Sequence, residues 1–431
     1  MRSITAAIAL VTMSLAFAGA AGPVAEAAQP AHTRYVKLFD ALWSTVNDHF
    51  YDPRFRGVNW KAMGANYRRK LDGIANDKQF ESLATNMLDE LGTSHLYIEP
   101  PSRSAAAGVG IGARFRTIGG QVLVSALDPL SNARAKGVRA GDRLLSPRSA
   151  LYGQPGTFAS LKFQSCAGQV RTIDIRREEA FWPPEHPGFE WHSVTLSPHR
   201  TIDYIKIDRF DDGAAALADR AMAELRDTSG LIIDVRANSG GNLSAARLAS
   251  YFISGPPRVA VALFSREYLE RLGHPVTAAA VAAAPKVSGA YTDKAIMAAV
   301  AVHHGGAVFM TEDMGGKGYT KPVVVLIGGR TGSAAEGFAW MMHGYTKATL
   351  AGRKTAGALL SAETFDLPGG WKVTVPVQGV WGADGTDYRD RPVTPNVTVT
   401  WTRNDLCSGR DPDIAQALKL LAAPLALNGD R

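Results

Sequence analysis

The spacing of apolar residues predicts helices in the first quarter of the chain. Apolar positions recur at intervals of three or four residues, at Leu38, Leu42, Val46 and Phe50 and again at Phe80, Leu83 and Met87. This period places them on one face of an α-helix. We therefore predict a helical N-terminal module over residues 33–100, in which Gly92 ends the last helix and extended chain follows.

The pattern then changes to short strands separated by glycine turns. Strands are predicted at Val122–Ala126, Leu161–Phe163 and Ile173–Ile175, because short runs rich in β-branched and aromatic residues favour a pleated sheet. We expect a β-rich domain over residues 105–180. The proline- and histidine-bearing stretch 182–200 is interpreted as a linker.

A buried strand that runs into paired glycines and then into a helix occurs twice in the C-terminal half. Leu231–Val235 precedes Gly240 and Gly241, and Val323–Ile327 precedes a helical pattern over Ala334–Met342. This repetition predicts an α/β domain of ββα-type units over residues 200–405. Residues 264–319 are either an insertion or a lid. A helix near 413–421 and a tail complete the final segment, 406–431.

The first residues resemble an export signal. Arg2 is followed by an alanine-rich apolar run, Ile4–Ala21, and a small-residue cleavage site ends at Ala27. We predict a signal peptide over residues 1–27 and an exported protein, periplasmic or extracellular; an uncleaved anchor is the alternative. No later apolar run is long enough to span a bilayer, so we expect no transmembrane segment in the mature chain.

Charge and cysteine content indicate whether nucleic acid, a disulfide or a metal site is to be expected. The formal net charge is +7, but Lys and Arg are scattered and no nucleic-acid motif accompanies them, so we expect no nucleic-acid partner. Cys166 and Cys407 are the two cysteines. Export permits a disulfide between them, and free thiols are the alternative. Their spacing matches no zinc site, so we expect no metal.

Ser333 is the candidate nucleophile. It lies at the turn between a buried strand and a helix, where unpaired helix N–H groups and the positive end of the helix dipole can face an oxyanion. Ser333 and Glu336 also match a capping box, S-x-x-E, which implies no chemistry. This window alone favours the cap.

His95 is the candidate base. It follows Ser94 in a glycine turn, and imidazole is the side chain that is a neutral base near pH 7. Ten histidines occur in the chain, so a lone histidine in a turn carries little weight by itself.

Gly240 and Gly241 form either a simple turn or an oxyanion hole, because glycine lets backbone N–H groups approach a ligand.

Two motifs in the β-rich domain resemble a PDZ domain. Gly108, Val109, Gly110 and Ile111 resemble its carboxylate-binding loop, and Ala133–Leu145 resembles its A-x-x-x-G-[VL]-x-x-G-D-x-[IL] hallmark. Such a domain binds the ends of chains by β-augmentation. The first motif also suits any tight turn.

The order of the motifs from about Tyr35 to Val399 resembles the tail-specific, or C-terminal processing, serine peptidases and the tricorn core peptidases. The lysine base of the first branch would stand at Ala358, and the neighbouring Lys354 is interpreted as a surface residue. The G-T-S-H turn of the tricorn-like branch matches Ser94 and His95. The resemblance therefore implies a Ser–His mechanism. It also makes Ser333 the nucleophile, in place of the cap.

The acidic residue of that branch is harder to assign. A direct count places Arg389 where a glutamate is expected, and either Asp390 or Asp387 could serve instead; we choose Asp390. A carboxylate there would orient the imidazole and stabilise its charged form.

The resemblance implies an α/β fold: a helical N-terminal module, a PDZ-like β-rich domain and a crotonase/ClpP-like ββα domain. It also implies an endopeptidase that cleaves polypeptides, with unstructured carboxyl ends as candidate targets, and needs no cofactor. The oxyanion would be bound by N–H groups of Ala334 and of Gly240 or Gly241. The alternatives are an inactive family member that binds peptide or lipid, and a serine esterase. The oligomeric state stays open.

Overall fold

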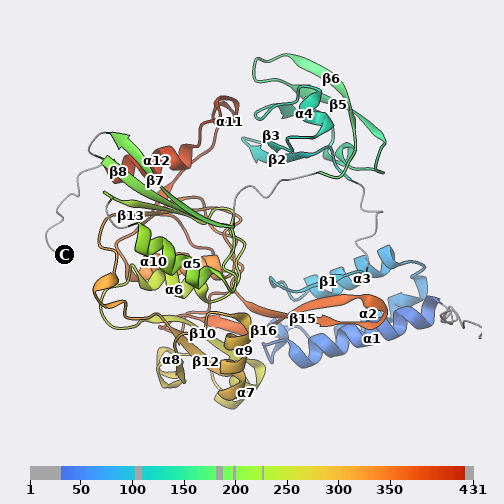
Figure 1. Cartoon of the computed structure of the whole chain (residues 1–431). Helices are drawn as coiled ribbons and strands as arrows, with labels where there is room; N and C mark the ends of the chain where they lie inside the picture. The colour runs from blue at the N-terminus through green and yellow to red at the C-terminus, as the bar shows by residue number, and fades with distance from the viewer. Residues whose placement is uncertain (1–30, 102–108, 181–187, 198–199, 226–227, 423–431) are drawn as a thin grey trace, which may run out of the picture.

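The computed structural model describes residues 31–101, 109–180, 188–197, 200–225 and 228–422 (Figure 1). The predicted signal peptide and Gly108 lie outside these ranges. Within them, no helix is both long and apolar enough to cross a membrane.

Three helices form the N-terminal module: α1 (Ala31–His49), α2 (Trp60–Arg68) and α3 (Asp77–Asp89). The side chain of Asn76 caps α3 by accepting the N–H of Gln79. The apolar faces pack together as predicted, but they share one core with strands that come from the far end of the chain. The helical module is therefore built onto the C-terminal region, as Figure 1 shows.

Those strands belong to the first six-stranded sheet, in the order β1-β16-β10-β12-β11 with β15 also paired to β16. Its strands are β1 (Tyr97–Glu99), β10 (Val259–Ser265), β11 (Lys286–Val287), β12 (Gly306–Met310), β15 (Ser361–Asp366) and β16 (Lys372–Trp381). The helices between its strands are α7 (Arg266–Leu272), α8 (Ala278–Ala283) and α9 (Asp293–Val302). Residues 264–319 thus build strands and helices of this sheet, and the expectation of an insertion or a lid stays a prediction.

The second six-stranded sheet has the order β17-β14-β13-β9-β8-β7. Its strands are β7 (Phe189–Ser197), β8 (Arg200–Ile207), β9 (Leu231–Asp234), β13 (Val323–Ile327), β14 (Thr349–Gly352) and β17 (Val397–Thr398). β13 is parallel to both neighbours, and all five of its residues are buried, as its continuous apolar run predicts. β7 corrects the linker interpretation of residues 182–200, because Phe189–Ser197 pairs with β8 along the sheet edge.

Helices cover both faces of this second sheet. α5 (Ala214–Glu224), α6 (Ser244–Ser250) and α10 (Ala334–Tyr345) share one buried cluster with alternate strand residues such as Ile233 and Val325. α12 (Pro412–Ala422) packs with the other set, which includes Ile232 and Val324. The alternation of side chains along each strand explains why every residue of β13 is apolar.

Residues 109–180, the β-module, form a five-stranded sheet with a separate apolar core. The strands are β2 (Ala113–Ile118), β3 (Gln121–Leu127), β4 (Arg143–Leu144), β5 (Phe158–Gln164) and β6 (Val170–Arg176), with the short helix α4 (Asn132–Ala135) beside them. The three strands predicted from the sequence lie within β3, β5 and β6.

The β-module is tied covalently to the C-terminal segment. Cys166 and Cys407 form a disulfide, which resolves the two alternatives left by the sequence. Arg403, which begins α11 (Arg403–Ser408), adds hydrogen bonds to the carbonyl oxygens of Gly141, Gln164 and Ser165. Figure 1 shows α11 reaching from the second sheet toward the β-module. These contacts hold the module in one position beside the sheet.

We expect the double substitution Cys166→Ser/Cys407→Ser to lower the free energy of unfolding. The bridge spans 241 residues, and loss of a long covalent loop typically costs about 2–5 kcal/mol. Urea unfolding followed by tryptophan fluorescence measures the change. The wild type kept in dithiothreitol is the control and should match the variant. An unfolding midpoint that does not move would contradict this prediction.

Candidate active site

Ser333 lies where β13 turns into α10, in a strained backbone conformation. Its φ is 50°, a region that side-chain-bearing residues rarely adopt. Its N–H donates to the carbonyl oxygen of Ala358 at 3.0 Å and to Oε2 of Glu336 at 3.2 Å. These bonds hold the sharp turn that presents the hydroxyl to the adjacent cleft.

His95 lies in the turn between α3 and β1, also with a positive φ, of 60°. Its Nδ1 is 3.1 Å from Oγ of Ser94. Burial lowers the pKa of His95 below its ordinary value near 6.5. The imidazole is therefore neutral at neutral pH, as a general base must be.

Ser333 and His95 line the same cavity, the Ser333 cleft, which has a volume of about 550 Å³. The antiparallel pairing of β1 with β16, Tyr97 opposite Thr374, brings the histidine turn to this place. Much of the wall is apolar and comes from Val261, Leu263, Ile296, Met297, Met341, Leu359, Leu360 and Val380. The two predicted residues, distant in the sequence, thus border one cleft.

Gly240 and Gly241 occupy different positions at the cleft. The N–H of Gly240 donates to Oδ1 of Asn238 at 2.9 Å, and a Cβ on Gly240 would lie 2.6 Å from Cβ of Ser333. Gly240 therefore makes room for the serine. Gly241 and Ala334 line the cleft, and within the described residues their N–H groups have no hydrogen-bond partner. These two groups are the ones available to an oxyanion.

The sequence predicts that Asp390 orients the imidazole of His95, but its carboxylate is not hydrogen-bonded to this ring. Its carboxylate accepts from Nη2 of Arg56 at 2.7 Å, and Nη1 of Arg56 donates to the carbonyl oxygen of Gly92 at 2.5 Å. Among the described residues, neither Ser94 nor His95 is hydrogen-bonded to Asp390. The carboxylate reaches the histidine turn indirectly, through the guanidinium group of Arg56.

Arg389, at the position expected for a glutamate, belongs to a separate cluster. It contacts Oη of Tyr51 at 3.0 Å, Asp52 at 3.3 Å and Asp387 at 2.7 Å. Asp387 is therefore paired with Arg389, and burial raises the pKa of its carboxyl group. Neither aspartate considered from the sequence is bonded to His95.

A lysine base is absent from the Ser333 cleft. Ala358 occupies the expected place and uses its backbone to accept from Ser333. Lys354 is exposed and does not line the cleft, in agreement with the sequence interpretation.

Glu336 is the residue whose importance the sequence pattern understated. It is fully buried, and its carboxylate accepts from the N–H groups of Gly357 at 2.6 Å and Ala358 at 2.7 Å, from the hydroxyl of Thr355, and from the N–H of Ser333. Burial raises its pKa, and these hydrogen bonds partly offset the rise. The S-x-x-E spacing predicted the bond to Ser333. The bonds to residues 355–358 depend on tertiary structure.

The predicted carboxylate-binding loop of the β-module is partly described. Val109 pairs with Gly153, the carbonyl oxygen of Gly110 accepts from the N–H of Glu178, and Ile111 is buried. Gly108 lies outside the described residues. The strand that follows the loop, β2, is an edge strand of its sheet, as strand addition by a peptide requires.

The described residues contain no group of three or more His, Cys, Asp or Glu side chains that could hold a metal ion. The chemistry of the cleft is that of a serine and a neutral imidazole beside free backbone N–H groups. With the two flanking sheets, this arrangement defines the class of the serine-type peptidases.

Comparison with known protein families agrees with that class. Residues 201–399 match the model of peptidase family S41, and residues 31–89 match the model of the tricorn protease C1 domain. Residues 201–399 therefore form a region of the peptidase family S41 type.

Curated relatives are peptidases of the same two branches. Tricorn protease homolog 1 of Streptomyces coelicolor is 26% identical over 261 residues, which are 52% of this chain and 23% of the relative. The chloroplastic C-terminal processing peptidase of Tetradesmus obliquus is 24% identical over 396 residues, 84% of this chain and 76% of the relative. The chain spans only about a fifth of the length of the tricorn homologues.

Two solved structures share the fold. The photosystem II D1 C-terminal processing protease is 20% identical with a TM-score of 0.53, covering 91% of this chain and 98% of that one. Mature CPAF is 14% identical with a TM-score of 0.64, covering 91% and 97%.

We expect Glu336→Gln to destabilise the fold by about 1–3 kcal/mol, because the amide NH2 would face hydrogen-bond donors that the carboxylate now satisfies. Urea unfolding measures the change. The matched control is Glu267→Gln, at an exposed ion pair with Arg271, which should cost less than about 1 kcal/mol. Equal effects of the two substitutions would contradict the role assigned to Glu336.

Proposed function

We propose that this protein is an exported serine endopeptidase in which Ser333 attacks the peptide carbonyl and His95 is the general base. The observation that supports this most directly is that both residues line one cleft. The hydroxyl of serine is a weak nucleophile unless a base removes its proton. In the first step the C–N bond of the peptide breaks, the amine leaves with the proton that His95 took from Ser333, and an acyl-enzyme forms; water then hydrolyses this ester and frees Ser333.

The contact between His95 and Ser94 determines which nitrogen acts. Neutral imidazole carries one N–H. If Nε2 is to accept the proton of Ser333, this N–H must be on Nδ1, where it donates a hydrogen bond to Oγ of Ser94, 3.1 Å away. Ser94 then selects the tautomer, a role that a carboxylate fills in other serine peptidases. Burial of His95 favours the neutral form before proton transfer.

The oxyanion is stabilised by the N–H groups of Ala334 and Gly241. Both line the cleft and have no other partner within the described chain. One such donor typically lowers the barrier by about 3 kcal/mol. Gly240 contributes space beside Ser333 instead of a donor, because its N–H is bonded to Asn238.

Asp390 acts through Arg56. Its carboxylate holds the guanidinium group, which in turn binds the carbonyl oxygen of Gly92 in the histidine turn. Asp390 is therefore proposed as a positioning residue for His95. Within the described residues no carboxylate is hydrogen-bonded to the imidazole, and this favours the rival interpretation, an inactive family member that binds peptide or lipid.

The substrate is proposed to be an unstructured polypeptide. The apolar wall of the cleft favours apolar side chains next to the scissile bond. The β-module, with its loop at residues 108–111 and the edge strand β2, is proposed to bind free carboxyl ends. Export is proposed from the leader over residues 1–27, and the disulfide supports an oxidising compartment.

Ser333→Ala should reduce cleavage of an unstructured, apolar-rich polypeptide by at least about a thousandfold, and His95→Ala should reduce it nearly as much. Lys354→Ala is the matched control, because it lies near the nucleophile in sequence but outside the cleft, and it should retain full activity. Wild-type activity in the Ser333 variant would reject the assignment. Loss in the Lys354 variant alone would support a Ser–Lys mechanism. A wild type that cleaves aryl esters but no polypeptide would identify an esterase.

Binding of carboxyl ends predicts a preference between two forms of one peptide. The form with a free carboxyl end should be cleaved faster at limiting concentration than the form with an amidated end, because backbone N–H groups bind the carboxylate. Initial rates for the two forms measure this preference. Equal rates would contradict capture of the tail while leaving the mechanism at Ser333 intact.

A further inference from the structure

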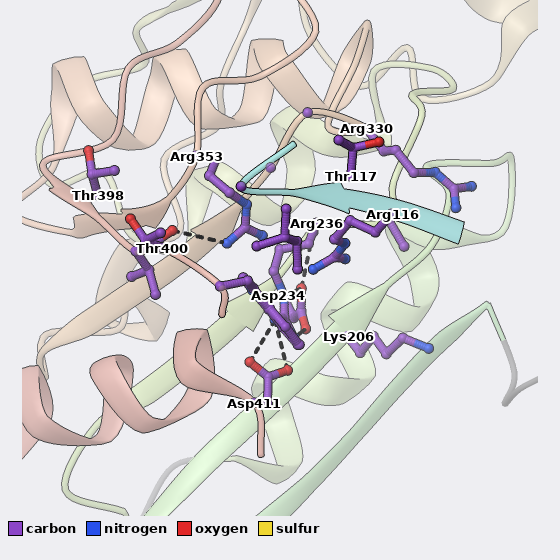
Figure 2. A pocket seen from close by; sticks show the side chains of 17 residues that line it. Arg116, Thr117, Lys206, Asp234, Arg236, Arg330, Arg353, Thr398, Thr400 and Asp411 are labelled. Carbon is purple, nitrogen blue, oxygen red and sulfur yellow. Dashed lines mark hydrogen bonds and ion pairs between the residues drawn. The ribbon is translucent and has the colours of Figure 1, made fainter. Parts of the chain in front are cut away.

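A second and larger cavity, the junction cavity, lies between the β-module and the second sheet. It has a volume of about 770 Å³. Residues 116–119 of the β-module form one side, and the loops after β9 and β13 together with residues 398–401 form the other. Figure 2 shows β2 passing over arginine and aspartate side chains of the second sheet.

The lining of the junction cavity is strongly cationic. Five basic side chains face two carboxylates: Arg116, Lys206, Arg236, Arg330 and Arg353 against Asp234 and Asp411. This excess of positive charge is concentrated in one concave space, although Lys and Arg are scattered over the chain as a whole. A concave site lined by charges of one sign attracts ligands of the opposite sign.

Two of these arginines are already paired with carboxylates. Arg236 is paired with Asp234, Asp411 and Asp413, and Arg353 is bonded through both Nη atoms to Asp413. Asp413 is completely buried. This network attaches the start of α12 to the second sheet, so its charges serve the fold. Lys206 also has a partner, because its ammonium group lies 3.3 Å from Asp208.

Arg116 and Arg330 have no such partner. Within the described residues, neither forms an ion pair, and the guanidinium group of Arg116 instead lies 4.5 Å from the ring centroid of Trp401. Desolvation and repulsion from Arg353 and Arg236 lower the pKa of Arg116, while attraction to Asp413 and Asp411 opposes the shift. The guanidinium group of Arg116 thus adds to a local excess of positive charge that an anion would offset.

The shape of the cavity leaves room for that anion. Gly329, beside Arg330, has no heavy atom within 4 Å of the position where a Cβ would stand. The volume is within the range of pockets that bind small molecules. The disulfide Cys166–Cys407 and the hydrogen bonds of Arg403 fix the two walls relative to each other. The site is therefore preformed.

We infer that the junction cavity binds a small polyanion that carries at least two carboxylate or phosphate groups, contacted by Arg116 and Arg330. Guanidinium groups bind both kinds of oxyanion through paired hydrogen bonds. Trp401 provides an apolar face beside Arg116. This inference goes beyond the proposed peptidase function and does not depend on it, because the cavity is separate from the Ser333 cleft.

The test is calorimetric titration of the full mature chain carrying Ser333→Ala, with citrate and with inorganic tripolyphosphate as the two probes, at low ionic strength. We expect at least one of the two probes to bind, with one molecule per chain. The probe with the lower dissociation constant shows whether carboxylate or phosphate is the preferred group. The double substitution Arg116→Gln/Arg330→Gln should weaken binding by about tenfold or more, since charge-assisted hydrogen bonds are lost.

The matched control is Arg148→Gln/Lys347→Gln, which removes the same charge from one exposed residue of the β-module and one of the core, neither of them lining the cavity. It should change the dissociation constant by less than about twofold, as expected for screened surface charges. Absence of binding by both probes, or equal weakening in the two double variants, would overturn the inference. Thermal unfolding of each variant verifies that it is folded.

Discussion

The candidate active site depends on the pairing of two strands from opposite ends of the chain. β1 has three residues and pairs with β16, and this contact carries the histidine turn to the edge of the Ser333 cleft. Such a short strand has little stability alone. The N-terminal helices stabilise it, because Leu42 and Phe80 are buried in the same core as Trp371 and Val373 of the β16 region. Each fully buried side chain of this size contributes about 1.5–3 kcal/mol. The helical module therefore holds His95, the proposed base, in place.

Both proposed catalytic residues are held in conformations that the backbone alone would not prefer. Ser333 and His95 each have a positive φ, and the surrounding contacts must compensate for the cost of about 1–3 kcal/mol per residue. At Ser333 the compensation comes from Glu336 and Ala358, which both accept its N–H. At His95 it includes the bond from Arg56 to Gly92, supported by Asp390. The carboxylates of Glu336 and Asp390 thus support the backbone at these two residues.

Local patterns predicted the parts of the fold that local physics determines. β13 matches the predicted strand Val323–Ile327, and α10 begins at the predicted Ala334. β7 was missed because it is an edge strand whose outer residues are exposed, and its polar positions resemble a linker. The elements of residues 264–319 were not predicted, because the strands there are short and alternate with alanine-rich helices. The sequence also named Ser333, His95 and Ser94 as site residues; these roles stay predictions, and Ser333 and His95 line one cleft. The contact of Asp390 with Arg56 joins residues 334 positions apart, and no local pattern reports such a pair.

The central claim is that a neutral His95 activates Ser333 across the cleft. The most direct measurement is the rate at which a fluorophosphonate probe labels the protein as a function of pH, with the labelled residue identified by mass spectrometry. The account predicts a label on Ser333. Burial lowers the pKa of His95 below its ordinary value near 6.5. Labelling should therefore be lost as the pH falls, with a midpoint below that value, because the protonated imidazole cannot act as a base. The His95→Ala variant should lose both the label and this pH dependence. Labelling of Ser333 that is equally fast in the His95 variant, or no labelling in the wild type, would contradict the account.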